Sequence, residues 1–510
     1  MIEKLIMLAV FFAVMIVAGV LTRRHARSVE GFVLGGRRVG PWLSAFAFGT
    51  SYFSAVIFVG YAGQFGWKFG LSAVWIGIGN ALLGSLLAWW VLGERTREVT
   101  RRLGASTMPE FFGKRFRSQG LRIASAAIIF VFLIPYTASV YNGLSRLFTM
   151  AFGVPYEVCV IAMALFTCVY VVLGGYMATV VNDFMQGVVM LAGIVAVVCA
   201  VLAQNGGLVE ALGQMAAVSA DGSAAPGALV SVLGPDPFAL ASVVLLTSLG
   251  TWGLPQMVQK FYAIESKRAI RKGAVISTVF ALVVAGGSYF MGGFARLYAD
   301  QVPFVAEGRP AFDAIVPAML QGLPDLLVGL VVVLVLSASM STLSSLVLTS
   351  SSVLTLDMLR QVGPLGRMSE RATVATMRGL VAVFVAVSAA IALVQYHGSI
   401  AFIAQMMSVS WGALAGSFLG PLFWGLFSAR VSKAAVWASF ACGVGITLGN
   451  MAVPFLGSPI TAGAAAMLAS LAVVPLVSLV TKAVPFEVRP VRGPEAVDAA
   501  PCRQSGDGCA

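Results

Sequence analysis

Long apolar stretches separated by short polar connections occupy the chain from residue 4 to residue 482. A membrane-spanning helix needs roughly twenty mostly apolar residues, because that length at about 1.5 Å per residue crosses the hydrocarbon core. The pattern therefore predicts an all-α integral membrane protein with about thirteen spanning helices. They are expected at residues 4–22, 41–65, 70–93, 121–149, 156–175, 179–204, 237–262, 272–298, 325–356, 377–396, 400–427, 432–453 and 459–482.

Lysine and arginine cluster on alternate connections between these segments. Basic loops of membrane proteins stay in the cytoplasm, so the clusters report the orientation of the chain. One membrane topology places all the clusters in the cytoplasm. It is a multi-pass protein of the cell inner (plasma) membrane with its N-terminus outside, an odd number of spans and its C-terminus in the cytoplasm. The clusters lie within residues 23–38, 94–122, 267–272, 360–378 and 430–433.

The composition agrees with a membrane protein and argues against several other classes. Of 510 residues, 59% are hydrophobic and 11% are charged, which is too little polar surface for a soluble domain. The net charge of +12 forms no continuous stripe, so we expect no nucleic-acid partner. Lipid and a small-molecule substrate are the expected partners, and no obligate protein partner is evident. No acid–base pair, nucleophile–base pair or metal cluster is visible at membrane depth, so we do not expect an enzyme.

The apolar segments divide into parts that predict the organisation of the chain. Spans 2–6 and spans 7–11 form two halves of five helices each, and because five is odd the halves run in opposite senses, as in an inverted repeat. The expected parts are an extra N-terminal transmembrane helix with a cytoplasmic loop at 1–39, the first repeat at 40–206, an extracytoplasmic loop at 207–236, the second repeat at 237–428, two peripheral helices at 429–482 and a disordered cytoplasmic tail at 483–510.

The first helix of each half is interrupted by polar or helix-breaking residues. Residues 49–54 read Gly-Thr-Ser-Tyr-Phe-Ser, and residues 250–256 read Gly-Thr-Trp-Gly-Leu-Pro-Gln. A membrane helix can break only where its freed backbone groups face protein or a wet cavity. Matching interruptions in two inverted halves therefore indicate a central binding site. The alternative is that glycine and proline only kink these helices for packing.

Small hydroxyl residues form a stripe on the ninth span. Ala338, Ser341, Thr342 and Ser345 fall at spacings of three and four residues, so they share one helical face. Such a stripe serves close helix packing in many membrane proteins. Alternatively, the Ser341 and Thr342 hydroxyls, with carbonyls freed at the break in the second span, provide the neutral oxygens that a hard cation such as sodium prefers.

Asp183 is an ionisable residue in the sixth span. A carboxylate near membrane depth indicates a functional site by default. The alternative is a carboxylate that reaches the cytoplasmic interface beside Gly174 and Gly175.

Several motifs in these segments resemble those of the sodium:solute symporter family. They are Gly40-Pro41-Trp42, Gly174-Gly175-Tyr176-Met177-Ala178 followed by Asp183, Pro255-Gln256 with Lys260-Phe261-Tyr262-Ala263, Ser339-Met340-Ser341-Thr342-Leu343-Ser344, and Trp411-Gly412-Ala413-Leu414-Ala415-Gly416 with Gly420-Pro421-Leu422.

The resemblance implies a LeuT-type five-plus-five inverted repeat with a broken first helix in each repeat. It also implies sodium as the coupling ion. The ion would bind the carbonyls of Thr50, Phe53 and Ala338 and the hydroxyls of Ser341 and Thr342. Asp183 matches an intramembrane aspartate that in some members contributes to a second sodium site, together with the hydroxyl at the position of Thr342, or to coupling.

Three departures from the family pattern leave the solute open. Tyr52 stands where proline symporters of this family have an aspartate, and Leu254-Pro255-Gln256 replaces the familiar Gln-Pro-His. The aromatic gate that several members have in the seventh span falls on Thr251, next to Trp252. We expect the solute pocket to be lined by five residues near the two breaks, namely Ser51, Tyr52, Ser54, Trp252 and Gln256.

The expected function is sodium-coupled import of a small organic solute, such as an amino acid, pantothenate or a monocarboxylate, by alternating access. Proton coupling through Asp183 on the same fold is an alternative. A transporter-like solute sensor and a channel are two others.

Overall fold

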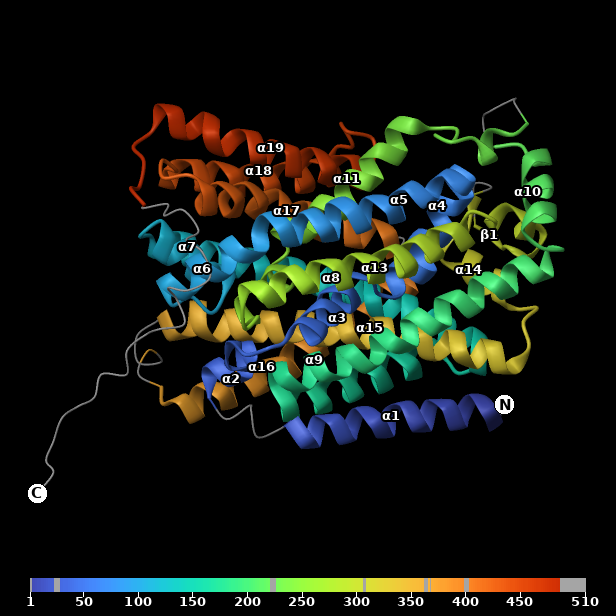
Figure 1. Cartoon of the computed structure of the whole chain (residues 1–510), viewed down its shortest axis with the longest axis horizontal. Coiled ribbons are helices and arrows are strands. Elements are labelled where there is room, and N and C mark those ends of the chain that lie inside the picture. The colour runs from blue at the N-terminus through green and yellow to red at the C-terminus, as the bar shows by residue number, and fades with distance from the viewer. Residues whose placement is uncertain are drawn as a thin grey trace, which may run out of the picture.

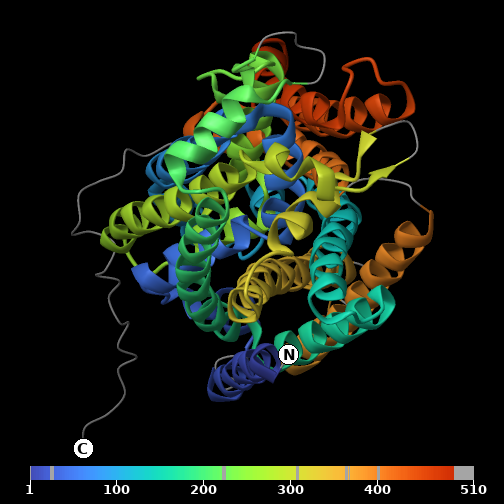
Figure 2. The ribbon, with the colours of Figure 1, turned by 90° about the vertical axis from the view of Figure 1, so that its right-hand side faces the viewer.

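The structure is a computed structural model that describes residues 2–22, 28–220, 226–305, 309–361, 366, 368–398 and 403–486. Most of its helices run along the long axis of the molecule (Figure 1). Viewed along that axis, they surround α15 (Asp325–Val353), which lies near the middle of the bundle (Figure 2). Nearly all residues of α15 from Val328 onward are buried, so this helix contacts protein on every side.

All named elements in the described residues of the first part of the chain are helices, with η marking short 3-10 or π-helical segments. Its elements are α1 (Ile2–Thr22), α2 (Val29–Leu34), η2 (Gly35–Arg37), α3 (Pro41–Tyr52), η3 (Val56–Tyr61), α4 (Ala62–Phe69), η4 (Gly70–Ala73), α5 (Val74–Gly79), η5 (Asn80–Leu87), η6 (Trp89–Gly93), α6 (Glu94–Leu103), α7 (Met108–Arg115), α8 (Gln119–Phe152) and α9 (Tyr156–Gln204).

The second part adds the central helix and a small hairpin. The hairpin pairs Phe304 with Pro310, and its two-residue strands are the only strands among the described residues. The elements are α10 (Leu208–Ala217), η7 (Ala228–Val230), α11 (Pro237–Gly253), α12 (Pro255–Ala263), α13 (Lys267–Gly292), η8 (Ala295–Gln301), β1 (Phe304–Val305), β2 (Arg309–Pro310), α14 (Phe312–Leu320), α15, η9 (Leu354–Met358), η10 (Leu359–Gln361), α16 (Glu370–Gly398), α17 (Ile403–Phe427), α18 (Lys433–Ala452) and α19 (Pro459–Val480).

The two interruptions predicted from the sequence are real breaks, and each is narrower than its motif. Helix α3 continues through Tyr52, and only Phe53 and Ser54 leave the helical conformation. The Ser54 hydroxyl then accepts a hydrogen bond from the Val56 amide at 3.2 Å, which helps to start the next helical segment. At the second break Leu254 is extended, with φ −78° and ψ 125°.

Pro255 explains the second break. A proline restricts the preceding residue to extended conformations, and its missing N–H is tolerated at the first position of a helix. Pro255 takes that position in α12, and the axes of α11 and α12 differ by 46°.

Two very long helical segments contain further breaks, each at a glycine with positive φ. Helix α9 has 49 residues, and Gly175 within it has φ 57° and ψ −154°. The helical run from Val56 to Leu103 has 48 residues, and Gly70 within it has φ 61° and ψ −139°. Only glycine adopts such angles without strain, so each of these glycines divides its long run into two helical segments. The boundary predicted at 175–179 falls on Gly175.

By length and composition, nine helices in the described part of the chain could cross a membrane, or ten if α11 and α12 form one span. Because two of these contain the breaks at Gly70 and Gly175, the count of thirteen stays a prediction. The domain boundaries also stay a prediction. Residues 23–27 of the expected cytoplasmic loop and residues 487–510 of the expected tail lie outside the described residues.

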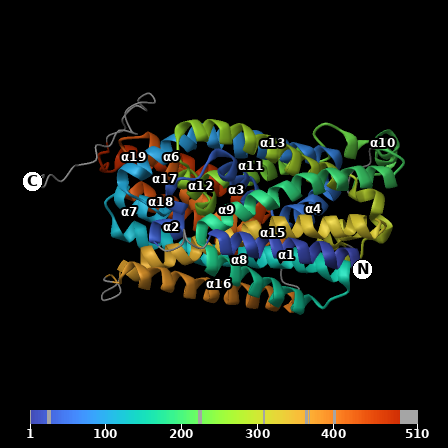
Figure 3. The same ribbon diagram turned by 60° about the horizontal axis from the view of Figure 1, so that its bottom comes forward.

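The two ends of the bundle differ in character. The start of α1 lies at the end that carries α10, α14 and the hairpin, whereas α19 finishes at the end that carries α6 and α7 (Figures 1 and 3). An odd number of crossings requires this arrangement.

Residues of the predicted basic clusters gather at the α6–α7 end. Arg101 donates to the Arg37 carbonyl at 3.0 Å, and Arg115 donates to the Ser428 carbonyl at 2.8 Å. Arg122 pairs with Asp357 at 2.6 Å. The alternate loops identified in the sequence therefore meet on one side of the bundle.

Helices α4 and α13 approach each other closely at two glycines. A Cβ atom built on Gly66 would lie 1.8 Å from the Gly292 carbonyl oxygen, so neither position has room for a side chain. Close backbone approach at small residues is a common way to pack membrane helices.

Candidate functional site

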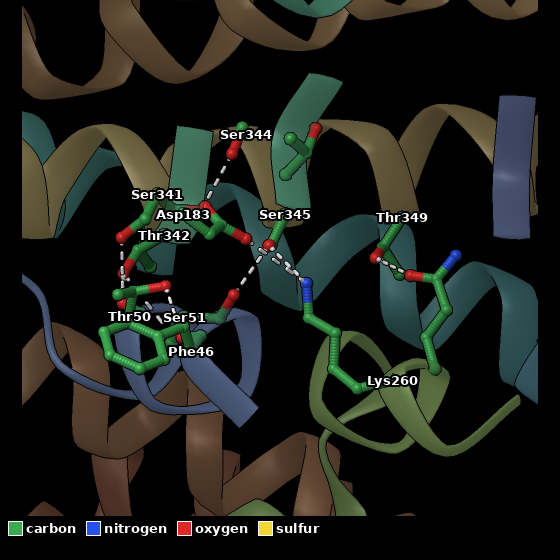
Figure 4. A network of polar contacts seen from close by, with 12 residues as sticks. Phe46, Thr50, Ser51, Asp183, Lys260, Ser341, Thr342, Ser344, Ser345 and Thr349 are labelled. Carbon is green, nitrogen blue, oxygen red and sulfur yellow. Dashed lines mark hydrogen bonds and ion pairs between the residues drawn. The ribbon is translucent and has the colours of Figure 1, made fainter. Parts of the chain in front are cut away.

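Buried oxygen atoms crowd together where the end of α3 meets the middle of α15. The Ser341 Oγ lies 2.9 Å from the Thr50 carbonyl oxygen and 3.0 Å from that of Ala338. The Thr342 Oγ1 lies 3.1 Å from the Ala338 oxygen, 3.4 Å from that of Thr50 and 3.5 Å from that of Ser51. Figure 4 shows both hydroxyls pointing toward the end of α3.

The two hydroxyls of this cluster have more carbonyl oxygens within reach than they have protons to donate. Each hydroxyl has one proton, so the two of them donate two hydrogen bonds, yet they make five close contacts with three carbonyl oxygens. Ser341 and Thr342 are fully buried, so bulk water does not contact them. A small hard cation prefers to be coordinated by several uncharged oxygen atoms that converge in a buried place, as these hydroxyl and carbonyl oxygens do.

Four of the five residues predicted to hold sodium contribute to this cluster: Thr50, Ala338, Ser341 and Thr342. Phe53 lies at the break itself, where its amide donates to the Gly49 carbonyl at 3.2 Å. The structure does not join the Phe53 carbonyl to either hydroxyl by a hydrogen bond, so its part in a cation site stays a prediction.

A second polar group adjoins the oxygen cluster. Ser51, next to Thr50, shares a 2.8 Å hydrogen bond with Ser345, one turn along α15 from Ser341. The Ser345 hydroxyl also accepts a 3.1 Å hydrogen bond from the Lys260 ammonium of α12. The same ammonium lies 3.8 Å from the Asp183 carboxylate of α9. The group of Ser51, Ser345, Lys260 and Asp183 therefore connects four helices (Figure 4).

Asp183 is completely buried, which excludes a carboxylate that reaches the interface. Its partner Lys260 was part of a motif in the sequence, but no role was predicted for it. The signal was present, because Lys260 is the one cation in residues 255–263. Periodicity alone does not show whether a lysine near a helix end extends to solvent or points inward.

The five residues expected to line a solute pocket have different surroundings. Ser51 is bonded to Ser345, and Ser54 supports the start of η3. The Tyr52 hydroxyl donates to the Thr247 carbonyl at 2.6 Å, and its ring stacks on Phe53 with centroids 4.3 Å apart. These three residues lie together at the first break.

The two pocket residues from the second break are placed differently. Gln256 is fully buried, and neither its amide oxygen nor its amide nitrogen has a hydrogen-bond partner in the described part of the protein. Trp252 donates its indole N–H to the Leu83 carbonyl at 2.9 Å, and its ring lies 6.5 Å from that of Phe423. The structure joins Trp252 to none of the other four by a hydrogen bond or a ring contact.

Further buried polar side chains lie on the η3 side of the first break. The Tyr61 hydroxyl is 3.0 Å from the Ser408 hydroxyl, and Thr247 donates to Asn80 at 2.8 Å. The Trp411 ring faces that of Tyr52 with centroids 6.1 Å apart. Sequence reasoning assigned no binding role to Tyr61 or Trp411, because an aromatic residue in an apolar span resembles ordinary core.

These oxygen and ring clusters belong to a segment that matches a known family. The sequence matches the sodium:solute symporter family over residues 32–443. The chain belongs to this family. Membership identifies a multi-pass membrane transport protein, with a small-molecule substrate and with sodium as the coupling ion, and not an enzyme.

Two relatives are similar over most of this symporter. An osmoregulated proline transporter of Bacillus subtilis is 30% identical over 367 residues, which are 70% of this chain and 71% of the relative. A sodium/proline symporter of Staphylococcus aureus is 28% identical over 451 residues, which are 86% of this chain and 84% of the relative.

The architecture has a solved counterpart. A Na⁺-coupled sialic acid symporter, determined in a substrate-bound outward-open state, superimposes with a TM-score of 0.74 at 14% sequence identity. The match covers 95% of this symporter and 99% of that chain. At this identity the likeness concerns the fold alone, and it confirms the expected all-α LeuT-type fold.

Proposed function

We propose that this symporter imports a small organic solute together with sodium by alternating access. The observation that supports the proposal best is the convergence of the Ser341 and Thr342 hydroxyls on the Thr50 carbonyl at the broken end of α3. Sodium bound there would connect α3 to α15. The hydroxyl and carbonyl oxygens, which now contact one another, would then coordinate the ion instead. The ion would thereby stabilise one arrangement of the first break, as a coupling ion must.

The solute would bind beside the first break. Ser51, Tyr52 and Ser54 come from this break, and Gln256 comes from the start of α12. The unpartnered amide of Gln256 supports its role, because a buried amide without hydrogen bonds is costly unless a ligand or water pairs with it. Trp252 would act by supporting η5 through its bond to the Leu83 carbonyl and not by contacting the solute.

The class of solute is an amino acid, pantothenate, a monocarboxylate or a similar small molecule. The two relatives are named for proline, so proline is the first candidate to test. The uncharged Tyr52, whose hydroxyl is already bonded to Thr247, supports testing solutes beyond proline.

The orientation is also part of the proposal. The end of the bundle that carries α6, α7 and the basic loops would face the cytoplasm, and the end that carries α10 and the hairpin would face outward across the plasma membrane. Sodium would then enter from outside, down its electrochemical gradient, and the two five-helix repeats would rearrange around the central site.

Uptake into proteoliposomes tests this function. Purified protein is reconstituted, and radiolabelled proline, other amino acids, pantothenate and monocarboxylates are offered under an inward sodium gradient. We expect saturable uptake of at least one solute that depends on sodium and is abolished when potassium or choline replaces it.

Two other results would contradict the proposal. Uptake driven by a pH gradient at constant sodium would indicate proton coupling. Ion conductance without saturable solute counterflow would indicate a channel.

A further inference from the structure

A lysine in the interior raises the question of how many sodium ions this symporter binds. Lys260 is 2% exposed and projects from α12 toward α15 and α9 (Figure 4). Its ammonium donates to Ser345 at 3.1 Å, lies 3.8 Å from Asp183 and stands 5.3 Å from the centre of the Tyr176 ring. Each of these neighbours stabilises a positive charge, so together they form a binding position for a cation, which the lysine ammonium occupies.

The same neighbours would suit a free metal ion. The Asp183 carboxylate and the Ser345 hydroxyl are hard oxygen donors, and neither carboxylate oxygen has a hydrogen-bond partner among the described residues. Without Lys260, this position would hold one buried negative charge and several oxygens, which is what a second sodium requires. With Lys260, the charge of Asp183 is already balanced.

A sodium ion and the ammonium cannot share this position. Two positive charges a few ångströms apart in a low-dielectric interior repel strongly, and a single carboxylate can neutralise only one of them. A second sodium held by Asp183 would therefore have to compete with the Lys260 ammonium, a cation that belongs to the protein itself.

We propose that the Lys260 ammonium is a built-in replacement for a second sodium, so that this symporter binds one sodium ion per chain, at the Ser341–Thr342 cluster. This inference rests on the proposed sodium-coupled function. It assigns Lys260 as a residue that determines ion stoichiometry, and it assigns Asp183 as the residue that positions the ammonium.

Equilibrium binding of radioactive sodium to the purified full chain in lipid nanodiscs tests the inference without knowledge of the solute. The native protein is expected to saturate at one ion per chain. Lys260→Met replaces lysine by an unbranched side chain that is one atom shorter and uncharged, which frees Asp183, and it is expected to saturate at two. The double variant Lys260→Met/Asp183→Asn is expected to return to one.

Two controls define the comparison. Lys260→Arg retains the charge and should saturate at one ion. Lys272→Met removes an exposed cation from α13 and should also saturate at one. Size-exclusion chromatography of each sample shows whether it is folded. If Lys260→Met does not fold, Lys260→Gln, which also removes the charge and keeps Asp183, takes its place: two ions per folded chain support the inference, and one ion contradicts it.

The outcomes separate this inference from the function on which it rests. Two ions on the native chain, or one ion on a folded Lys260→Met, would overturn the role of Lys260 and leave sodium coupling intact. No saturable sodium binding by the native chain would count against the proposed coupling itself.

Discussion

At the scale of single residues, the candidate ion site depends on uncharged oxygens held in place by burial. Ser341 and Thr342 are adjacent on α15, yet both hydroxyls reach the Thr50 carbonyl because that carbonyl lies at the end of a broken helix. A carbonyl inside an intact helix, such as that of Ala338 in α15, is already hydrogen-bonded to the amide four residues on, whereas Thr50 lies where α3 ends. The approach of both hydroxyls to the Thr50 carbonyl therefore depends on the break as well as on the hydroxyl pair.

Removal of one hydroxyl should weaken sodium binding. We expect Ser341→Ala and Thr342→Ala each to raise the sodium concentration for half-maximal binding about tenfold, which corresponds to about 1.4 kcal/mol. Equilibrium sodium binding and sodium-dependent uptake both measure the change.

Ser339→Ala is the matched control for this prediction. Ser339 is equally buried on the same helix, but its hydroxyl donates only to the Val335 carbonyl of α15 itself, at 2.7 Å. Equal losses in Ser339→Ala and Ser341→Ala would contradict a specific role for the hydroxyl pair.

Predictions about single residues agreed with the structure where they depended only on the spacing of residues along one helix. The three- and four-residue spacing on α15 is enough to place Ala338, Ser341 and Thr342 on one face, and the structure shows that this face meets α3. Spacing could not show that Trp252 points toward Leu83, or that Lys260 reaches Asp183, because both depend on how distant helices pack.

At the scale of helices, breaks and close crossings shape the molecule. The sequence located both breaks, since Pro255 and the Gly-Thr-Ser run of the second span are strong local signals. It overestimated their extent, because only Phe53 and Ser54 at the first break, and Leu254 at the second, leave the helical conformation. Tertiary contacts hold Thr50, Ser51 and Tyr52 in the helix despite their modest helix propensity.

The crossing of α4 and α13 should tolerate no side chain. Gly66→Ala would place a methyl group against the Gly292 carbonyl, and overpacking of this kind costs about 1–3 kcal/mol. We expect a lower yield of folded protein and a lower midpoint in thermal unfolding monitored by fluorescence size-exclusion chromatography.

Gly286→Ala is the control for this crossing. Gly286 also lies in α13, but a Cβ atom there would have no neighbour within 4 Å. Its thermal midpoint should match that of the native protein or exceed it slightly, because alanine favours helix more than glycine does. Equal destabilisation of both variants would show that the crossing is not the cause.

At the scale of the whole molecule, the alternation of basic loops could be read from the sequence once the apolar segments had been placed. The structure brings those loops together at one end through bonds such as Arg101 to Arg37 and Arg115 to Ser428. The number of crossings could not be fixed in the same way, because Gly70 and Gly175 join consecutive helices with no polar loop between them.

The orientation can be tested with single cysteines in a background from which all six native cysteines have been removed. A membrane-impermeant thiol reagent should label a cysteine at Lys68 in intact cells. It should label a cysteine at Lys114 or Lys267 only after the cells are permeabilised. Labelling of Lys114→Cys in intact cells would contradict a cytoplasmic position for the α6–α7 end.

The hydrogen bond between Ser51 and Ser345 has a consequence for how substitutions combine. Ser51 follows Thr50 of the candidate ion site, and Ser345 accepts a hydrogen bond from the Lys260 ammonium. A substitution that moves Thr50 or Lys260 can therefore affect the other residue through this 2.8 Å hydrogen bond. Residues linked in this way show non-additive free energies. A thermodynamic cycle built from Thr342→Ala and Lys260→Arg should therefore show an interaction energy in sodium affinity, and Ser51→Ala should abolish it.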